Sequence, residues 1–232
     1  MIKIRELIKK FGDMTAVDIP ELFIESGTML GVVGNNGAGK STLFRLMLDL
    51  LQPNQGWVEL NGINPANDEN WKNFTGAYLD EGFLIDFLTP EEYFNFVAKA
   101  CNLSKEQLQA KLQQFEAFMA GEILNQKKLI RNFSAGNKQK IGIVAAMLNN
   151  PALLILDEPF NFLDPSSQHI LKKILTDYHQ QTNATILVSS HNLQHTIDIS
   201  NQIALLEHGR IIKCLDNANH SAEAELEAYF NV

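Results

Sequence analysis

The chain has 232 residues, of which 45% are hydrophobic, so it is long enough to bury a full core. Its 27 acidic residues outnumber its 19 basic residues, for a formal net charge of −8, and it has no dense run of lysine and arginine, which excludes nucleic acid as the expected partner. Apolar stretches such as 151–156 are far shorter than the roughly 20 residues that cross a bilayer. Cys101 and Cys214 have no partner at metal-ligand spacing, so we expect a cytoplasmic chain with reduced thiols.

The amino-terminal part mixes strand patterns with one strand–loop–helix unit. Residues 1–6 alternate apolar and polar side chains like a strand, and Asn61-Gly62 is a strong hairpin turn signal. Between them a short apolar run is followed by glycines and then by a segment of helical periodicity. The segments predicted from these patterns are a buried strand over 29–34, a helix over 43–51 and a strand over 57–60.

The middle of the chain changes to helical signals. Residues 89–92, Thr-Pro-Glu-Glu, place a capping threonine, a proline and a glutamate where a helix begins, and Ser104 with Gln107 repeats the capping signal. Residues 90–132 are therefore predicted as an all-helical insert with one apolar face. The apolar residues that recur at helical spacing within it are Leu108, Leu112, Phe115 and Met119.

The alternation of strands and helices resumes after this insert, which predicts the α/β class. A turn over 207–210 leads into a last strand, and Ser221 is the predicted cap of a short terminal helix with Leu226, Tyr229 and Phe230. The other strands are predicted over 153–157, 185–189 and 203–206.

Residues 34–42 fit the phosphate-binding (Walker A) loop pattern, and they lie between a predicted strand and a helix start. In such a loop, backbone N–H groups surround the β-phosphate and the helix amino terminus adds partial positive charge. We expect Lys40 to reach the β- and γ-phosphates and Ser41 to hold Mg²⁺. The alternative is a glycine-rich structural turn. The residues predicted to bind nucleotide are Asn35, Asn36, Gly37, Ala38, Gly39, Lys40, Ser41 and Thr42.

Asp157 and Glu158 follow an apolar strand at its carboxyl end, where open α/β sheets bind ligands. Because successive strand residues point opposite ways, we expect different roles: Asp157 as the Mg²⁺ partner, and Glu158 as the group that orients and deprotonates the attacking water. Acids at a strand end alone are often only solvated. A GTPase is disfavoured because the nearest string to its Asn-Lys-x-Asp motif, 137–140, ends in lysine.

The string 132–140, Asn-Phe-Ser-Ala-Gly-Asn-Lys-Gln-Lys, resembles the signature motif of ATP-binding-cassette (ABC) ATPases, usually written Leu-Ser-Gly-Gly-Gln. Other landmarks of that family follow in order. Residues 161–164 resemble its D-loop, Ser190-His191 resembles its switch histidine, and residues 78–81 occupy the Q-loop position. Phe11 matches the upstream aromatic that stacks on adenine. The resemblance covers about residues 2–213.

This resemblance implies a P-loop NTPase fold of the α/β class, with a RecA-like core, an amino-terminal antiparallel β subdomain and an inserted α-helical subdomain. It implies a single ABC ATPase domain over 1–232. Residues 1–78 and 138–232 would form the α/β core with the β subdomain, and about 79–137 the helical subdomain that includes the Q-loop and the signature.

The resemblance also implies the role of each site residue. Catalysis is expected from Lys40, Glu158 and His191, with His191 sensing the γ-phosphate. Metal binding is expected from Ser41, Asp157 and Glu81. Phe11 would contact the adenine, and Asp164 belongs to the D-loop. The signature residues expected to touch ATP held by the opposite subunit are Ser134, Ala135, Gly136 and Asn137.

Several positions depart from the family pattern. Glu81 stands where the family usually has glutamine, and the metal and water contact of that position is carried over to it. Phe133, Ala135 and Asn137 replace leucine, glycine and glutamine of the signature, whereas Ser134 is retained. Phe162 replaces a small D-loop residue. Since Lys40, Asp157, Glu158 and His191 are all present, we expect an active enzyme.

The family's mode of action implies ATP and Mg²⁺ as cofactors. It also implies a homodimer, or a heterodimer with a related ATPase, and this dimer would bind beneath integral-membrane permease subunits. The chain would be peripheral on the inner face of the cell membrane. Phe83, Phe87 and Leu88 are candidates for docking the permease, although this aromatic region is equally typical of core packing. The alternatives are a soluble ABC ATPase or a regulatory ATP-binding protein not tied to transport, and a small-molecule P-loop kinase ranks behind them.

Overall fold

The computed structural model describes residues 1–218 and 221–230. Their strands are β1 (Ile2–Phe11), β2 (Met14–Ile24), β3 (Met29–Val33), β4 (Gln55–Leu60), β5 (Thr75–Tyr78), β6 (Leu153–Leu156), β7 (Thr185–Ser190), β8 (Gln202–Glu207) and β9 (Arg210–Asp216). Their α-helices are α1 (Lys40–Met47), α2 (Pro90–Ala100), α3 (Lys105–Gln114), α4 (Glu116–Met119), α5 (Ala135–Met147), α6 (Pro165–Thr182), α7 (Leu193–Ile199) and α8 (Glu223–Phe230).

The strands form two sheets. One is antiparallel, with the order β2-β1-β4, and the other has six strands in the order β5-β6-β7-β3-β8-β9. In the larger sheet the pairs up to β8 are parallel, and only β9 runs antiparallel to its neighbour. The strands β3, β6 and β7 are buried along their whole length, as expected for parallel strands covered on both faces.

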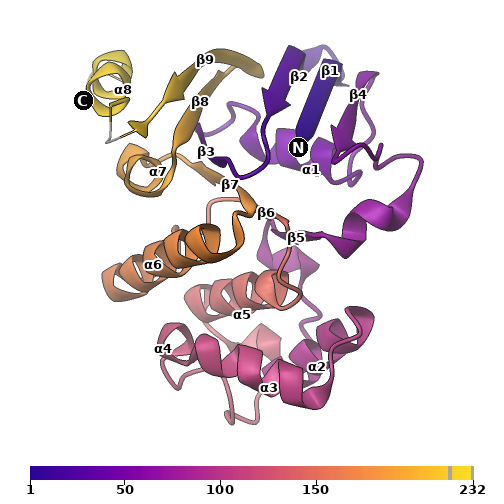
Figure 1. The fold of residues 1–232 in the computed structure, drawn as a ribbon, viewed down its shortest axis with the longest axis vertical. Helices are drawn as coiled ribbons and strands as arrows, with labels where there is room; N and C mark the ends of the chain where they lie inside the picture. The colour runs from indigo at the N-terminus through magenta and orange to yellow at the C-terminus, as the bar shows by residue number, and fades with distance from the viewer. Residues whose placement is uncertain (219–220, 231–232) are drawn as a thin grey trace.

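Helices cover the two faces of the larger sheet. Helix α1 lies between the two sheets, where Phe44 joins an apolar cluster with Ile4 of β1 and Leu30 of β3. On the other face α5 and α6 pack against the sheet, and α2, α3 and α4 form the end of the molecule farthest from β1 (Figure 1). The P-loop fold and its α/β class are therefore confirmed.

The capping signals in the middle of the chain are confirmed in detail. Thr89 and Glu92 form a capping box at the start of α2, with Pro90 at its first position, and Ser104 with Gln107 forms another at the start of α3. Each box satisfies backbone N–H groups that a helix start leaves unpaired. Local side-chain chemistry therefore decides where these helices begin.

The prediction that helix continues to residue 132 is wrong. Helix α4 ends at Met119, because Ala120 and Gly121 adopt left-handed backbone angles that end an α-helix, and Asn125 in the segment that follows is left-handed as well. The irregular segment still buries Ile123 in the core, so its apolar residues serve packing without helical geometry. Helix α1 also differs from its predicted range, since it starts at Lys40 with three residues of no apolar periodicity.

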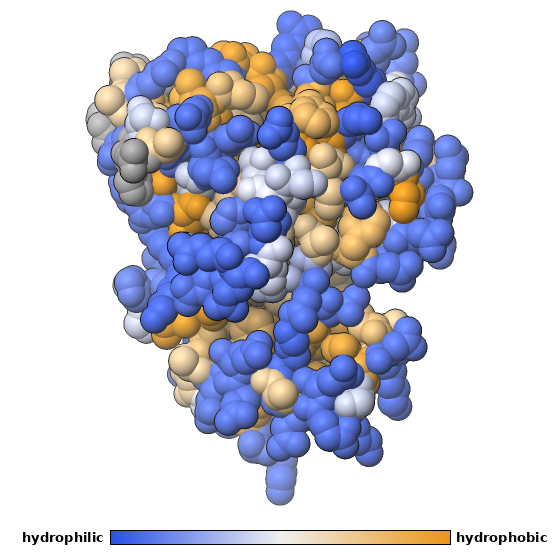
Figure 2. All heavy atoms as spheres, viewed as in Figure 1, coloured by the Kyte–Doolittle hydropathy of each residue, from blue (hydrophilic) through white to orange (hydrophobic). Residues whose placement is uncertain are grey.

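No helix among the residues described here is long and apolar enough to cross a membrane. The face shown in Figure 2 is largely hydrophilic, and its hydrophobic residues gather mainly in the upper half, over the strands. The terminal helix α8 is present as predicted, and its Leu226 packs with Val33, Ile197 and Ile203 beside the larger sheet.

Candidate functional site

The phosphate loop connects the buried strand β3 to the start of α1. Its lysine, Lys40, is 5% exposed and donates hydrogen bonds from Nζ to the backbone oxygens of Gly34 (2.7 Å) and Asn35 (3.3 Å). Gly39 has φ 109°, and a Cβ there would lie 2.5 Å from the backbone oxygen of Ala16. Only glycine fits this position, because any side chain would clash with the β1–β2 hairpin.

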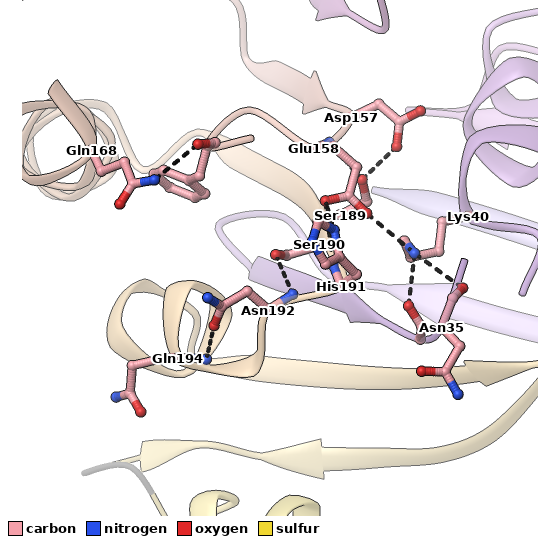
Figure 3. A network of polar contacts seen from close by, with 12 residues as sticks. Asn35, Lys40, Asp157, Glu158, Gln168, Ser189, Ser190, His191, Asn192 and Gln194 are labelled. Atoms are coloured by element: carbon pink, nitrogen blue, oxygen red, sulfur yellow. Dashed lines mark hydrogen bonds and ion pairs between the residues drawn. The ribbon is translucent and has the colours of Figure 1, made fainter. Parts of the chain in front are cut away.

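Three predicted catalytic residues meet in one ionic network (Figure 3). Lys40 Nζ lies 3.2 Å from Glu158 Oε1, and His191 Nδ1 lies 2.9 Å from Glu158 Oε2. The backbone N–H of His191 donates to the same Oε2 at 3.2 Å. These groups come from α1 and from the segments that follow β6 and β7, so the sheet brings them together at the carboxyl ends of its strands.

The carboxylates of Asp157 and Glu158 have different partners, but strand alternation is not the reason. Strand β6 ends at Leu156, and Glu158 has a left-handed φ of 47°. The Ser189 hydroxyl connects the two acids, because its Oγ donates to Asp157 Oδ1 and accepts from the Glu158 N–H at 2.8 Å. Ser189 was not among the predicted site residues, and its position next to Ser190-His191 was the available signal.

The buried carboxyl of Asp157 has a perturbed pKa. Burial raises this pKa above its ordinary value, and the charge of Glu158 adds to the rise. Hydrogen bonds from Ser189 and Ser41 and the positive charge of Lys40 lower it in part. Asp157 would bind a metal in its ionised form. Because burial disfavours that form, the ionised carboxylate lowers the free energy of unfolding of the protein.

This cost leads to a prediction for Asp157→Asn. Because the folded pKa lies above the unfolded value, the folded state binds more protons between the two, so the free energy of unfolding falls as the pH rises through that window. At about pH 7, removing the charge should raise the thermal midpoint of the protein by about 2–4 °C, the shift expected for ~1 kcal/mol.

Thermal unfolding of the wild type and the variant at about pH 7 and about pH 4 checks this prediction, with a smaller difference expected at the lower pH. Asp164→Asn is the matched control, because serine hydrogen bonds hold the pKa of Asp164 well below its usual range. That carboxylate stabilises the fold, so its neutralisation should bring no gain. A lower midpoint for Asp157→Asn at neutral pH would contradict the account.

A cavity of about 390 Å³ lies beside the ionic network. Ser41, Asp157 and Glu158 line it together with the Q-loop residue Glu81 and the signature residue Ala135. Hydroxyl and carboxylate oxygens are the hard ligands that Mg²⁺ prefers, and Mg²⁺ is usually held by one or two protein groups plus substrate phosphates. Ser41 and Asp157 fit this ion, and the described residues contain no separate cluster of three or more metal-ligating side chains.

Glu81, the third predicted metal ligand, pairs with a lysine in this structure. Its carboxylate is 56% exposed and forms an ion pair of 3.0 Å with Lys138 of α5. The preceding Asp80 pairs with Arg45 of α1 at 2.9 Å. The Q-loop thus forms one ion pair with α1 and another with the signature helix α5. The sequence did not predict these two ion pairs.

The signature residues stand at the start of α5. Ser134 caps this helix through its Oγ, which accepts from the Asn137 N–H at 3.3 Å, and Ser134 and Ala135 are exposed to solvent. A Cβ on Gly136 would lie 2.5 Å from the backbone oxygen of Phe162, so the close approach that requires glycine here is within the same chain. Among the described contacts, none joins Ser134 to Lys40, Glu158 or His191.

Asp164 and Phe11, which were also predicted as site residues, lie outside the ionic network. Asp164 caps α6, with its carboxylate accepting hydrogen bonds from Ser166 and Ser167. Phe11 ends β1 in the hairpin whose Ala16 approaches the phosphate loop, and its ring is 48% exposed with Lys9 Nζ 5.3 Å from the centroid. An exposed ring in this hairpin can accept a stacking partner.

Comparisons with known proteins agree with this geometry. A family model described as "ABC transporter" matches residues 18–161, and another, "AAA domain, putative AbiEii toxin, Type IV TA system", matches residues 125–198. The chain is 31% identical to the bacitracin transport ATP-binding protein BcrA of Enterococcus faecalis, over 92% of this chain and 68% of BcrA. It is 33% identical to the uncharacterized ABC transporter ATP-binding protein YhaQ of Bacillus subtilis, over 90% of this chain and 69% of YhaQ.

Solved structures show the same fold. An ATP-binding subunit of an ABC transporter superimposes with a TM-score of 0.84 at 27% identity, covering 100% of this chain and 93% of the other. The ATP-binding cassette MJ0796, in a dimeric post-hydrolysis state bound to ADP and Pi, has a TM-score of 0.84 at 21% identity, covering 94% and 99%. The chain belongs to the ABC transporter family. It is one of the family's ATP-binding subunits, an ABC-type ATPase, and it spans about two thirds of the length of BcrA and YhaQ.

Proposed function

We propose that this subunit hydrolyses ATP with Mg²⁺ as one half of a dimer and thereby powers transport of a substrate through a separate transmembrane permease. One observation carries the dimer: Lys40, Glu158 and His191 meet in one network, while the exposed signature serine, Ser134, is not joined to it. A second copy could present its Ser134 to a phosphate bound by Lys40. The dimeric MJ0796 cassette supports this arrangement.

The residues would act as follows. Phe11 stacks on the adenine, the N–H groups of 35–42 surround the phosphates, and Lys40 leaves Glu158 to pair with them. Ser41 and Asp157 would hold Mg²⁺, and this ion would supply Lewis-acid chemistry to the phosphate oxygens. Glu158 then takes a proton from the attacking water, and His191 contacts the γ-phosphate.

The partner copy would complete the site. Its α5 amino terminus offers N–H groups to the γ-phosphate, and the contacting residues are Ser134, Ala135, Gly136 and Asn137. Asp164 would hold the D-loop beside them by capping α6. We further propose the subdomain division at about residues 79 and 137, with the Q-loop and the signature in the helical part.

A groove beside the Q-loop supports a membrane partner. Its cavity of about 260 Å³ is lined by Leu50, Phe83, Tyr93 and Val97 among others, and Phe83 is 51% exposed at its rim. An amphipathic helix laid in such a groove buries its apolar face. The Q-loop borders this groove and also lines the cavity beside the ionic network. One segment therefore connects the groove with the catalytic residues.

The permease proposal is tested by purifying the tagged chain from detergent-solubilised membranes and identifying the bound proteins. We expect a polytopic membrane protein whose recovery falls with Phe83→Asp, because a carboxylate cannot be buried in an apolar groove. Phe96→Asp is the matched control, since Phe96 is 55% exposed on α2 outside this groove. A wild type that hydrolyses ATP but retains no membrane protein would instead support the soluble ABC ATPase.

A further inference from the structure

Gln139 has a position in this site that none of the predicted roles explains. It lies in the first half of α5, is 1% exposed, and lines the same cavity as Ser41, Asp157 and Glu158. Long polar side chains are seldom buried so completely without a specific partner. The contacts of its amide group therefore decide what it does.

The amide nitrogen of Gln139 holds the catalytic acid by its backbone. Nε2 donates to the backbone oxygen of Glu158 at 3.1 Å. A carbonyl oxygen can only accept, so this contact fixes the amide orientation and turns Oε1 away from Glu158. Oε1 is buried, and no donor among the described residues reaches it.

The backbone at Glu158 needs such support. Its φ of 47° is in the left-handed region, which a residue with a side chain occupies only when its surroundings hold it there. Its N–H donates to Ser189 Oγ at 2.8 Å, and its carbonyl accepts from Gln139 Nε2 at 3.1 Å and, at 3.3 Å, from the Asn161 N–H within the same turn. The side-chain hydrogen bonds from Ser189 and Gln139 hold the peptide groups on both sides of the Glu158 Cα to β7 and α5, and so they set the direction in which its carboxylate leaves the chain.

The Q-loop does not supply this support. Glu81 is engaged by Lys138, the residue directly before Gln139 on α5, at 3.0 Å. Two amide side chains line the cavity with Glu158, those of Asn161 and Gln139, and the one that donates to the Glu158 backbone is Gln139 on the signature helix. This places Gln139 between the signature at the start of α5 and the acid after β6.

We propose that Gln139 is a positioning residue for ATP hydrolysis: its amide N–H holds the Glu158 backbone, and its buried carbonyl oxygen accepts a hydrogen bond from a water molecule in the cavity. This inference rests on the proposed role of Glu158 as the general base. A buried acceptor inside a polar cavity is the kind of group that ordered water satisfies. Loss of the Gln139 amide would leave Glu158 in the site, but its carboxylate would no longer point in the direction needed for hydrolysis.

The test is Gln139→Met, which keeps the length of the side chain and removes both polar atoms. We expect kcat for ATP to fall by up to about 100-fold, as for small misplacements of a reacting group, with KM and ATP affinity unchanged. Gln114→Met, on the exposed face of α3, is the control and should retain the wild-type rate. If Gln139→Met does not fold, Gln139→Glu takes its place, because an ionised carboxylate cannot donate to the Glu158 oxygen.

A double variant separates positioning from a general structural effect. Because Gln139 acts through Glu158, adding Gln139→Met to Glu158→Gln should cause no further loss in single-turnover hydrolysis. A wild-type kcat for the folded Gln139 variant, or a full additional loss in the double variant, overturns the inference. An inactive wild type, or an unimpaired Glu158→Gln single variant, would instead refute the proposed function itself.

Discussion

Replacing Glu158 with glutamine is expected to slow ATP hydrolysis by about 10²- to 10⁴-fold, the usual contribution of a general base. Glutamine keeps the shape of the side chain but cannot take a proton from water. It also removes the carboxylate that pairs with Lys40 at 3.2 Å in the nucleotide-free chain. Phosphate no longer has to displace that carboxylate, so ATP should bind at least as tightly as to the wild type.

Phosphate release and gel filtration with ATP and Mg²⁺ measure both effects. We expect slow release together with an ATP-dependent dimer peak, because the variant binds ATP without consuming it. The control is Glu59→Gln, which removes a carboxylate from a surface ion pair with Lys3 at 3.1 Å and should hydrolyse normally. Full turnover by Glu158→Gln would show that this residue is not the base.

Ser134→Asp should reduce steady-state hydrolysis by at least about 10²-fold, the cost of losing one stabilising donor group, and should abolish ATP-dependent dimerisation. Aspartate caps a helix as well as serine does, so α5 should keep its start. The new carboxylate, however, would face the γ-phosphate held by the other copy and repel it. ATP affinity of the single copy should not change, since Ser134 is not joined to Lys40 in its own chain.

Equilibrium binding of a fluorescent ATP analogue, alongside hydrolysis, separates these effects. Ser104→Asp makes the same chemical change at the cap of α3, where the serine hydroxyl likewise accepts from the N–H three residues on and no phosphate contact is proposed. This control should behave like the wild type. Normal hydrolysis by Ser134→Asp would mean that no phosphate comes near the start of α5.

Features encoded over a few neighbouring residues could be predicted well. The phosphate loop, the caps at Thr89 and Ser104, and the acids after β6 each depend on local chemistry that a short string displays. The ABC family followed because several such strings occur in order. The end of the helical insert was missed because apolar spacing does not reveal the left-handed residues after Met119.

Contacts between distant parts of the chain could not be predicted. Ser189 connects Asp157 and Glu158, which lie about thirty residues before it in the sequence. Lys138 pairs with Glu81, which is also distant in sequence. No local sequence pattern reveals either contact. Gln139 had a weak signal as a glutamine in the helix after the signature. Its partner, the backbone of Glu158, carries no side-chain information and becomes visible only when α5 packs beside β6.

The central claim is that each ATP is bound by the phosphate loop of one copy and the signature of another. Mixing two inactive variants tests it directly, because Lys40→Met removes one half of the site and Ser134→Asp removes the other. Each mixed dimer would carry one intact site of two, so single-turnover hydrolysis in an equimolar mixture should recover to between roughly a quarter of the wild-type level, for random pairing, and roughly a half, if only mixed dimers form. A mixture no more active than the separate variants would contradict the shared site.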